Sequence, residues 1–322
     1  MPPTPLVTLW VALTAPASAQ SVFVHYDFDG TGVTSGGHVF ADDSGNGNDG
    51  VLVDNGTLDN GAYVTSPAAF GQAWNDPGEG SLADGDRVDL SVPYTPDAST
   101  PWTVSFWMDM YGGAVRPLFD PATQDDELYV RADSVNEVSL RLGGQGTVVW
   151  DTAGIVNQRS FAQYTLVADP GGIAGVDQDG DGLDDHVALY VDGVLMATTS
   201  TGLSSYATPV TMTAIGDGSA NNVFARESAG VYDELWVVDG FAMGAGAVWQ
   251  LHKRNHVCWS TSDGDGDGVP DDCDLCPSED ASHCDPDANG CIDDADSDGL
   301  LDCEEDLNGD DVYDEDTDLD GV

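Results

Sequence analysis

The sequence predicts an all-β protein: a two-sheet antiparallel sandwich over residues 20–256, followed by an irregular stalk over residues 257–322. Three observations support this fold class. Short apolar stretches of alternating pattern recur through the first part, separated by Gly, Asp, Asn and Pro. All cysteines lie in the second part, which has too few apolar residues to bury a core. The same part is rich in aspartate, so disulfides and metal ions are expected to stabilise it.

The clearest strand covers residues 102–109, where Trp102, Val104, Phe106 and Met108 alternate with other residues. The pair Asp192-Gly193 separates two apolar stretches and is typical of a two-residue hairpin turn. About 235 residues is an acceptable length for one all-β domain. Further strands are expected at residues 138–142, 164–167, 187–191 and 194–198.

One helix is predicted, over residues 243–254. Val248 and Leu251 are expected to face the sandwich, and by its position Trp249 is a further candidate. The basic residues Lys253 and Arg254 lie at the carboxyl end, where the helix dipole favours positive charge.

The charge of the chain is strongly negative. Its 322 residues include 58 acidic and 8 basic side chains, for a formal net charge of −50. From residue 255 onwards there are 25 acids and no Lys or Arg. Nucleic acids and anionic membrane surfaces both require cationic side chains, so neither is an expected partner. Without cations the acidic tail should be expanded by its own repulsion.

A calcium-loop pattern opens the tail at residues 263–277. Calcium takes six to eight oxygen ligands, and carboxylates at loop positions one, three and five supply three of them. Gly268 stands at position six, where a sharp turn is required. A solvated acidic segment is the alternative. The candidate ligands are Asp263, Asp265, Asp267, Asp271, Asp272 and Asp274.

The pattern repeats towards the end of the chain. A second loop is formed by Asp294, Asp296, Asp298, Asp302 and Glu305, with Gly299 at position six. A weaker loop has an aspartate in place of that glycine and consists of Asp306, Asn308, Asp310 and Asp314. Asp316, Asp318 and Asp320 begin a further loop, inside which the sequence stops, so we expect a longer natural protein.

Another calcium loop is predicted inside the sandwich. Asp177, Asp179, Asp181 and Asp185 occupy positions one, three, five and nine, and a glycine stands at position six. The loop lies between two predicted strands, so it should form a hairpin tip. A polar Asp-Gly turn without metal is the alternative.

The cysteines are expected to form disulfides, and their pairing is left open because six cysteines allow about 15 pairings. Zinc binding by Cys273, Cys276, Cys284 and Cys291 is an alternative on spacing alone. Carboxylate oxygens outnumber thiols in this region and suit calcium better. The six residues are Cys258, Cys273, Cys276, Cys284, Cys291 and Cys303.

Residues 1–19 have the pattern of a cleaved signal peptide. A short apolar run ends before Ala17-Ser18-Ala19, and the run is too short to span a bilayer. The absence of a basic residue before it departs from the usual pattern. We therefore expect a secreted or cell-surface protein, with no transmembrane segment in this sequence.

The tail resembles the thrombospondin type 3 repeat. The resemblance rests on the aspartate spacing from Asp263 onwards, the run Gly268-Val269-Pro270-Asp271-Asp272 and the pair Cys276-Pro277. It implies a calcium-wrapped stalk with little regular secondary structure.

Residues 20–256 resemble a LamG-like domain. The resemblance is carried, in order, by YDFDG at 26–30, DSGNGNDG at 43–50, WTVSFW at 102–107, ALYVDG at 188–193 and YDELWV at 232–237. It implies a jelly roll of the concanavalin A-like lectin and glucanase type, which binds glycans or proteins.

The same resemblance implies a structural calcium ion near the opening strand. Asp43 is the first candidate ligand, with Asn46 and Asn48 on its loop. Asp27 and Asp233 are added because their strands are expected to be neighbours. The alternative is that the loop side chains bond their own turn.

The sequence thus predicts a calcium-binding adhesion or recognition protein with an extracellular glycan or protein ligand. We expect no catalysis, because the Glu-x-Asp-x-x-Glu strand of laminarinase-like relatives is missing and the run after Asp233-Glu234 departs from it. A secreted glycoside hydrolase, which needs two acids flanking one bond, is the first alternative. A structural spacer is the second, and the oligomeric state is left open.

Overall fold

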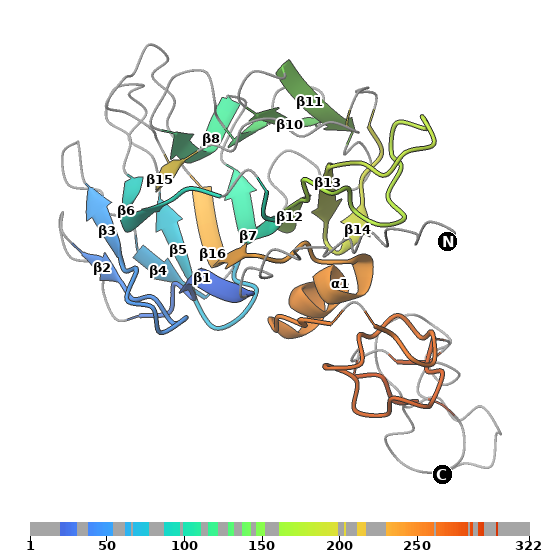
Figure 1. The fold of residues 1–322 in the computed structure, drawn as a ribbon. Coiled ribbons are helices and arrows are strands. Elements are labelled where there is room, and N and C mark those ends of the chain that lie inside the picture. The colour runs from blue at the N-terminus through green and yellow to red at the C-terminus, as the bar shows by residue number, and fades with distance from the viewer. Residues whose placement is uncertain are drawn as a thin grey trace, which may run out of the picture.

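Two antiparallel β-sheets packed face to face form the body of the protein (Figure 1). The predicted all-β sandwich with a disulfide-bonded tail is therefore confirmed. This computed structural model describes residues 20–30, 38–53, 62–65, 67–76, 87–96, 99–110, 115–121, 128–131, 137–142, 146–151, 161–198, 203, 211–216, 230–260, 262–282, 284–285, 289–292 and 301.

The first sheet, sheet A, has the strand order β14-β13-β12-β7-β16-β5-β4, and β1 also pairs with β16. Because β16 is long, β5 pairs with its first residues and β1 with its last. The strands are β1 (Ser21–Tyr26), β4 (Ala62–Val64), β5 (Ala73–Asp76), β7 (Trp102–Met110), β12 (Ala162–Ala168), β13 (Val187–Val191), β14 (Val194–Leu195) and β16 (Gly230–Asp239).

The second sheet, sheet B, has the order β11-β10-β9-β8-β15-β6-β3-β2. Its edge strand β2 lies on the same side of the sandwich as β4 of sheet A (Figure 1). The strands are β2 (Val39–Phe40), β3 (Gly50–Val53), β6 (Arg87–Tyr94), β8 (Val115–Pro121), β9 (Leu128–Arg131), β10 (Glu137–Leu142), β11 (Gly146–Asp151) and β15 (Met212–Gly216).

The hairpin predicted at Asp192-Gly193 joins β13 to β14. Both turn residues have left-handed φ, +48° and +77°, as a turn that matches the twist of the strands requires. Strand β14 ends at Leu195, earlier than predicted. Met196, 1 % exposed, belongs to the core and still donates its backbone N–H to Leu189 O of β13 at 2.9 Å.

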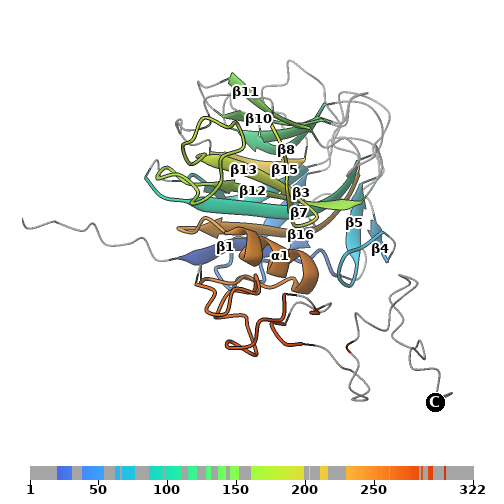
Figure 2. The same cartoon turned by 90° about the vertical axis from the view of Figure 1, so that its right-hand side faces the viewer.

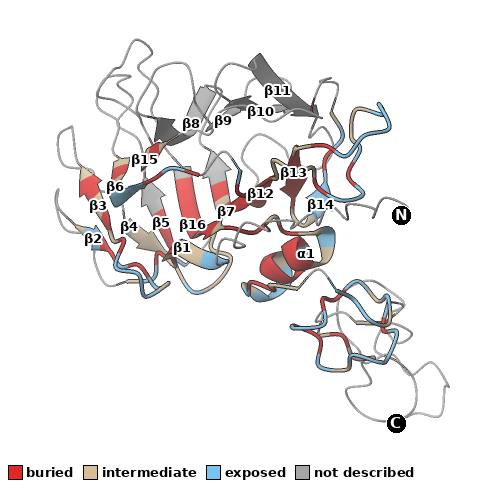
Figure 3. Ribbon diagram, in the orientation of Figure 1, coloured by how far each residue is buried: buried red, intermediate tan, exposed pale blue. Residues whose placement is uncertain are grey.

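Alternate residues of the strands fill the space between the sheets. On β7, Trp102, Val104, Phe106 and Met108 are at most 4 % exposed and belong to this first hydrophobic core. The alternation predicted for residues 102–109 is confirmed. Figure 3 shows how the buried residues concentrate in the strands of sheet A.

The outer face of sheet A is buried as well, because α1 (Ala245–Arg254) lies across it (Figure 2). The helix begins at Ala245 rather than at the predicted Met243. Val248 and Leu251 are fully buried as predicted, whereas Trp249 is 37 % exposed. The ring of Trp249 packs on the turn at Gly193, where an added Cβ would lie 2.5 Å from it. The helix therefore reaches the sheet edge through this tryptophan.

A second hydrophobic core joins the outer face of sheet A, α1 and the start of the tail. Val238 of β16 and Val248 of α1 belong to it, and so do Cys258, Val269 and Cys273. Figure 2 shows the start of the tail beneath α1, on the side of sheet A that faces away from sheet B.

Two disulfides cross-link the described part of the tail: Cys258–Cys273 and Cys276–Cys291. Their Cα atoms are 5.8 Å and 5.1 Å apart, within the usual range for a disulfide. Cys284 is disulfide-bonded too. The zinc alternative is therefore excluded, because its four cysteines are bonded to other cysteines.

Several predicted features lie outside the described residues. They are the signal peptide at residues 1–19, Cys303 and the tail ligands between Asp294 and Asp320. Within the described ranges, the structure contains no helix with the length and apolar character needed to cross a membrane.

Candidate calcium loops and a cavity at the sheet edge

The sandwich loop, residues 176–185, forms the tip of the hairpin between β12 and β13. Gly180 and Gly182 donate their N–H groups to Oδ1 and Oδ2 of Asp177, at 2.8 Å and 3.0 Å. Both glycines have positive φ, +73° and +83°. One oxygen from each of Asp177, Asp179 and Asp185 lies within 4.8 Å of the other two. Oxygens this close can share one ion, because calcium binds its ligands at about 2.3–2.6 Å.

Asp185 is the residue that points most directly to a cation. Its side chain is fully buried, and Oδ1 has no hydrogen-bond partner among the described residues. Oδ2 accepts bonds from the backbone N–H and the side-chain amide of Gln178. Burial raises the pKa of Asp185, and the nearby Asp179 and Asp177 raise it further against those bonds. A bound cation would offset both the burial of this charge and its repulsion by Asp177 and Asp179.

The first tail loop, residues 262–271, repeats this geometry. Gly266 and Gly268 donate to Oδ1 and Oδ2 of Asp263, again at 2.8 Å and 3.0 Å. Their φ values are +85° and +98°. One oxygen each of Asp263, Asp265 and Asp267 lies within 4.8 Å of the other two. Both loops therefore hold their first carboxylate with the same pair of glycine N–H groups.

The correspondence extends through both loops. In the sandwich loop the backbone N–H of Asp181 donates to Oδ1 of Asp179. In the tail loop the backbone N–H of Asp267 donates to Oδ1 of Asp265 in the same way. The ninth position matches as well: the backbone N–H of Asp185 bonds Val176 O at 2.6 Å, and that of Asp271 bonds Ser262 O at 2.8 Å. Two more pairs of bonds from a backbone N–H to a carboxylate match. Leu183 donates to Asp181 as Val269 does to Asp267. Gln178 donates to Asp185 as Gly264 does to Asp271.

Two other predicted tail ligands have different surroundings. Asp274 is 9 % exposed, and its Oδ2 has no partner among the described residues. Burial raises its pKa, as do the charges of the first tail loop, Asp267 foremost. Asp274 therefore lies close to the charges of that loop. Asp272 instead accepts a 2.6 Å bond from the backbone N–H of Trp259 and so links this part of the tail to its first residues.

A third loop, at residues 285–291, was not predicted. Asn289 and Gly290 donate to Oδ1 and Oδ2 of Asp285, at 2.9 Å and 2.8 Å, and Cys291 donates to Asn289 Oδ1 at 2.8 Å. Gly290 has φ +81°. The signal was present in the sequence, as Asp-x-Asp-x-Asn-Gly from Asp285. Residues 286–288, which include its middle acid, are outside the described ranges.

The loop after the opening strand is held mainly by its own hydrogen bonds. Asn46 and Asn48 donate their amides to Val22 O and Phe23 O. Asp42, which was not predicted, is the centre of this network. Burial would raise its pKa, but bonds donated by Ser44, Asn48 and His25 keep that pKa below its ordinary value. The two asparagine side chains therefore tie the loop to β1.

Asp43 lies instead beside Asp27, at the end of β1. Burial raises the pKa of Asp27, and the facing carboxylates of Asp43 and Asp29 raise it further.

β1 and β16 are neighbours, as expected, yet Asp233 bonds elsewhere. Its Oδ2 accepts from the backbone N–H groups of Ala69 and Phe70, at 2.7 Å and 3.3 Å. Asp233 is fully buried, and burial raises its pKa to about 8.

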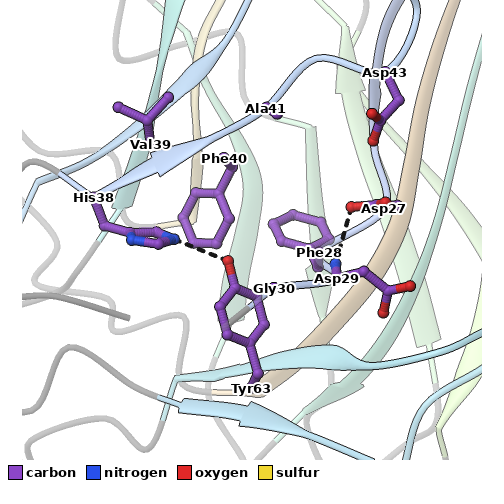
Figure 4. Close-up of a pocket in the computed structure, with 10 residues that line it drawn as sticks. All are labelled: Asp27, Phe28, Asp29, Gly30, His38, Val39, Phe40, Ala41, Asp43 and Tyr63. Atoms are coloured by element: carbon purple, nitrogen blue, oxygen red, sulfur yellow. Dashed lines mark hydrogen bonds between the residues drawn. The ribbon is translucent and has the colours of Figure 1, made fainter. Parts of the chain in front are cut away.

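A cavity of about 270 Å³ opens where β2 and β4, the edge strands of the two sheets, approach the end of β1 (Figure 4). One side carries three carboxylates, and the other carries His38 and Tyr63, joined by a 2.8 Å hydrogen bond. Burial lowers the pKa of His38, so its ring is neutral at neutral pH. The lining residues are Asp27, Phe28, Asp29, Gly30, His38, Val39, Phe40, Ala41, Asp43 and Tyr63.

The comparisons with known proteins gave structural neighbours only. No family model matches the chain, and no curated protein does. Domain 4 of a GH43 extracellular arabinanase from Geobacillus stearothermophilus, in complex with arabinotriose, is 18 % identical with a TM-score of 0.39; the match covers 73 % of this chain and 100 % of that domain.

Two further neighbours are larger proteins. A Trypanosoma rangeli sialidase complex is 12 % identical with a TM-score of 0.44, and the match covers 75 % of this chain and 35 % of the sialidase. The binding domain of Paraclostridial Mosquitocidal Protein 1 is 14 % identical with a TM-score of 0.44, covering 73 % of this chain and 52 % of that domain. The chain thus spans about a third of the sialidase and about half of the binding domain. At these scores we transfer no property from any of these proteins.

One prediction is corrected by these comparisons. We expected no catalysis, but the neighbours include a GH43 arabinanase domain and sialidases, which are glycoside hydrolases. The Glu-x-Asp-x-x-Glu strand is one way to place the two acids that hydrolysis needs. Its absence does not exclude hydrolysis by acids arranged in another way. The exclusion is therefore withdrawn.

Proposed function

We propose that the protein is a calcium-binding recognition protein of the cell exterior, in which calcium loops stabilise a glycan-binding sandwich and its tail. The observation that carries the calcium part is the repetition of one loop geometry at Asp177 and at Asp263. Each of these two distant segments also brings three carboxylate oxygens within 4.8 Å of one another, which supports a shared kind of ligand, and calcium prefers oxygen ligands. The acids of the remaining tail have the spacing for further loops, as in thrombospondin type 3 repeats.

Calorimetric titration of the metal-free full chain with calcium tests whether these loops bind calcium. Asp179→Asn/Asp181→Asn and Asp265→Asn/Asp267→Asn are matched variants, because each amide keeps the Oδ1 that accepts a backbone bond. Each pair should lose one site or bind it roughly tenfold more weakly or worse. The exposed Glu279→Gln serves as the control. Unchanged titrations in both variants would show that the loops are polar turns.

The glycan part rests on the cavity of Figure 4. Carboxylates accept hydrogen bonds from sugar hydroxyls, and aromatic side chains pack against their C–H faces. Here the two kinds of side chain line opposite sides of one opening, with Asp29 exposed at its mouth. The negative charge favours neutral or amino sugars and disfavours anionic ones.

Asp29→Asn should weaken the binding of neutral oligosaccharides roughly tenfold or more, because it removes a charge-assisted hydrogen bond. Its Oδ1, which accepts from the backbone N–H of Gln72, is retained. Binding is measured on a glycan panel that includes sialylated members, with Asp169→Asn as the control outside the cavity. Preference for sialylated glycans, or equal loss in both variants, would contradict this site. Assaying the same samples for released sugar separates binding from cleavage.

A further inference from the structure

The tip of the first tail loop is packed on the sandwich, whereas the tip of the sandwich loop at Leu183 is exposed. Val269 and Leu183 occupy the same loop position, yet Val269 is 4 % exposed and Leu183 is 59 % exposed. Val269 lies in the second hydrophobic core together with Val248 and Leu251 of α1. The same loop geometry therefore serves as a hairpin tip in one place and as a packing surface in the other.

The contact between helix and loop involves the backbones themselves. A Cβ added at Gly246 of α1 would lie 2.3 Å from the carbonyl oxygen of Gly268 and 3.3 Å from the ring of Pro270. Only glycine allows α1 to approach so closely.

The docking residues are positioned by the candidate calcium ligands. Gly268 donates its N–H to Asp263 Oδ2 at 3.0 Å, and Val269 donates to Asp267 Oδ1 at 2.7 Å. The second oxygens of Asp265 and Asp267 are buried and have no partner among the described residues. Asp274, nine-tenths buried, carries another such oxygen. The conformation that fits α1 is thus the one in which these carboxylates converge.

We propose that calcium in the first tail loop fastens the tail to the outer face of sheet A, so that this ion stabilises the sandwich as well as the tail. The proposal rests on the calcium binding proposed above and adds a coupling between that site and α1. Without the ion, the converging carboxylates repel one another. The loop then loses the shape that places Gly268 and Val269 against the helix. The disulfide Cys258–Cys273 keeps the tail attached, so the expected change is local loosening.

Hydrogen–deuterium exchange on the full chain tests the coupling, read on peptides that cover α1. In the wild type, chelating calcium should raise exchange in α1 several-fold. In Asp265→Asn/Asp267→Asn, α1 should exchange rapidly even with calcium present. The matched Asp179→Asn/Asp181→Asn should keep the wild-type response, since Leu183, the counterpart of Val269 in the sandwich loop, is 59 % exposed.

Gly246→Ala provides a second, independent test from the helix side. It should uncouple α1 from calcium while the number of ions bound, measured by calorimetry, stays the same. Failure of the proposed function and failure of the coupling are distinguishable. If calorimetry finds no calcium bound at the first tail loop, both proposals fall. If the ion binds there but exchange in α1 is the same with and without it, only the coupling is overturned.

Discussion

Replacing Asp185 with asparagine should have opposite effects on stability with and without calcium. The Asp185 carboxylate is fully buried beside Asp177 and Asp179, which costs free energy in the absence of a cation. The asparagine Oδ1 can take over the acceptor role towards Gln178, while its NH₂ group occupies the place of the unpartnered oxygen. Without calcium, the variant should therefore be more stable than the wild type.

With calcium the order should reverse. Extracellular calcium loops have Kd values of roughly 10⁻⁴ to 10⁻³ M, so about 10 mM calcium is some ten to a hundred times Kd. Mass action then stabilises the wild type by about 1.4 to 2.7 kcal/mol, and the variant gains less because its NH₂ group meets the ion. Thermal unfolding of both proteins, with chelator and with calcium, measures the two differences. The same order in both conditions would mean that no ion binds at Asp185.

The shape of the two candidate calcium loops could be predicted from the sequence because the groups that form it are close together in the chain. Positions one, three, five, six and nine are fixed by the chain itself, so the spacing at Asp177 and Asp263 contained the geometry. The hairpin at Asp192-Gly193 was predictable for the same reason. Whether a loop stays free or becomes docked is decided elsewhere. Val269 is buried because Gly246 leaves room for its loop, and no local pattern reveals that contact.

The surroundings of the remaining acids depend on long-range packing. Asp233 is separated by 164 positions from Ala69, whose N–H it accepts. The sequence analysis added Asp233 to the site at Asp43 because its strand and that of Asp27 were expected to be neighbours, but the backbone of residues 69–70 satisfies one of its oxygens instead. Asp42 was overlooked beside Asp43, although it organises the turn. The cavity depends on three segments meeting at an edge, and only the folded chain brings them together.

Asp233 should make the protein less stable as the pH rises from about 4 to 8. Burial raises its pKa from 3.8 to about 8. Between these values the folded state keeps a proton that the unfolded state has lost, so the stability present at low pH is lost as the pH rises towards 8. The expected loss is up to about 1.4 kcal/mol per pH unit from this residue. Asp233→Asn cannot ionise, and its Oδ1 can still accept from Ala69 and Phe70.

The variant should therefore match the wild type at about pH 4 and become the more stable protein above it, by about 4 kcal/mol near pH 7. Unfolding by denaturant at several pH values, with calcium held constant, measures the difference. Glu279→Gln removes an exposed tail acid and should run parallel to the wild type. A constant offset between Asp233→Asn and the wild type across this range would show that Asp233 does not titrate there. The variant isolates the residue because only the ionisation of position 233 differs, while the bonds to the 69–70 backbone remain.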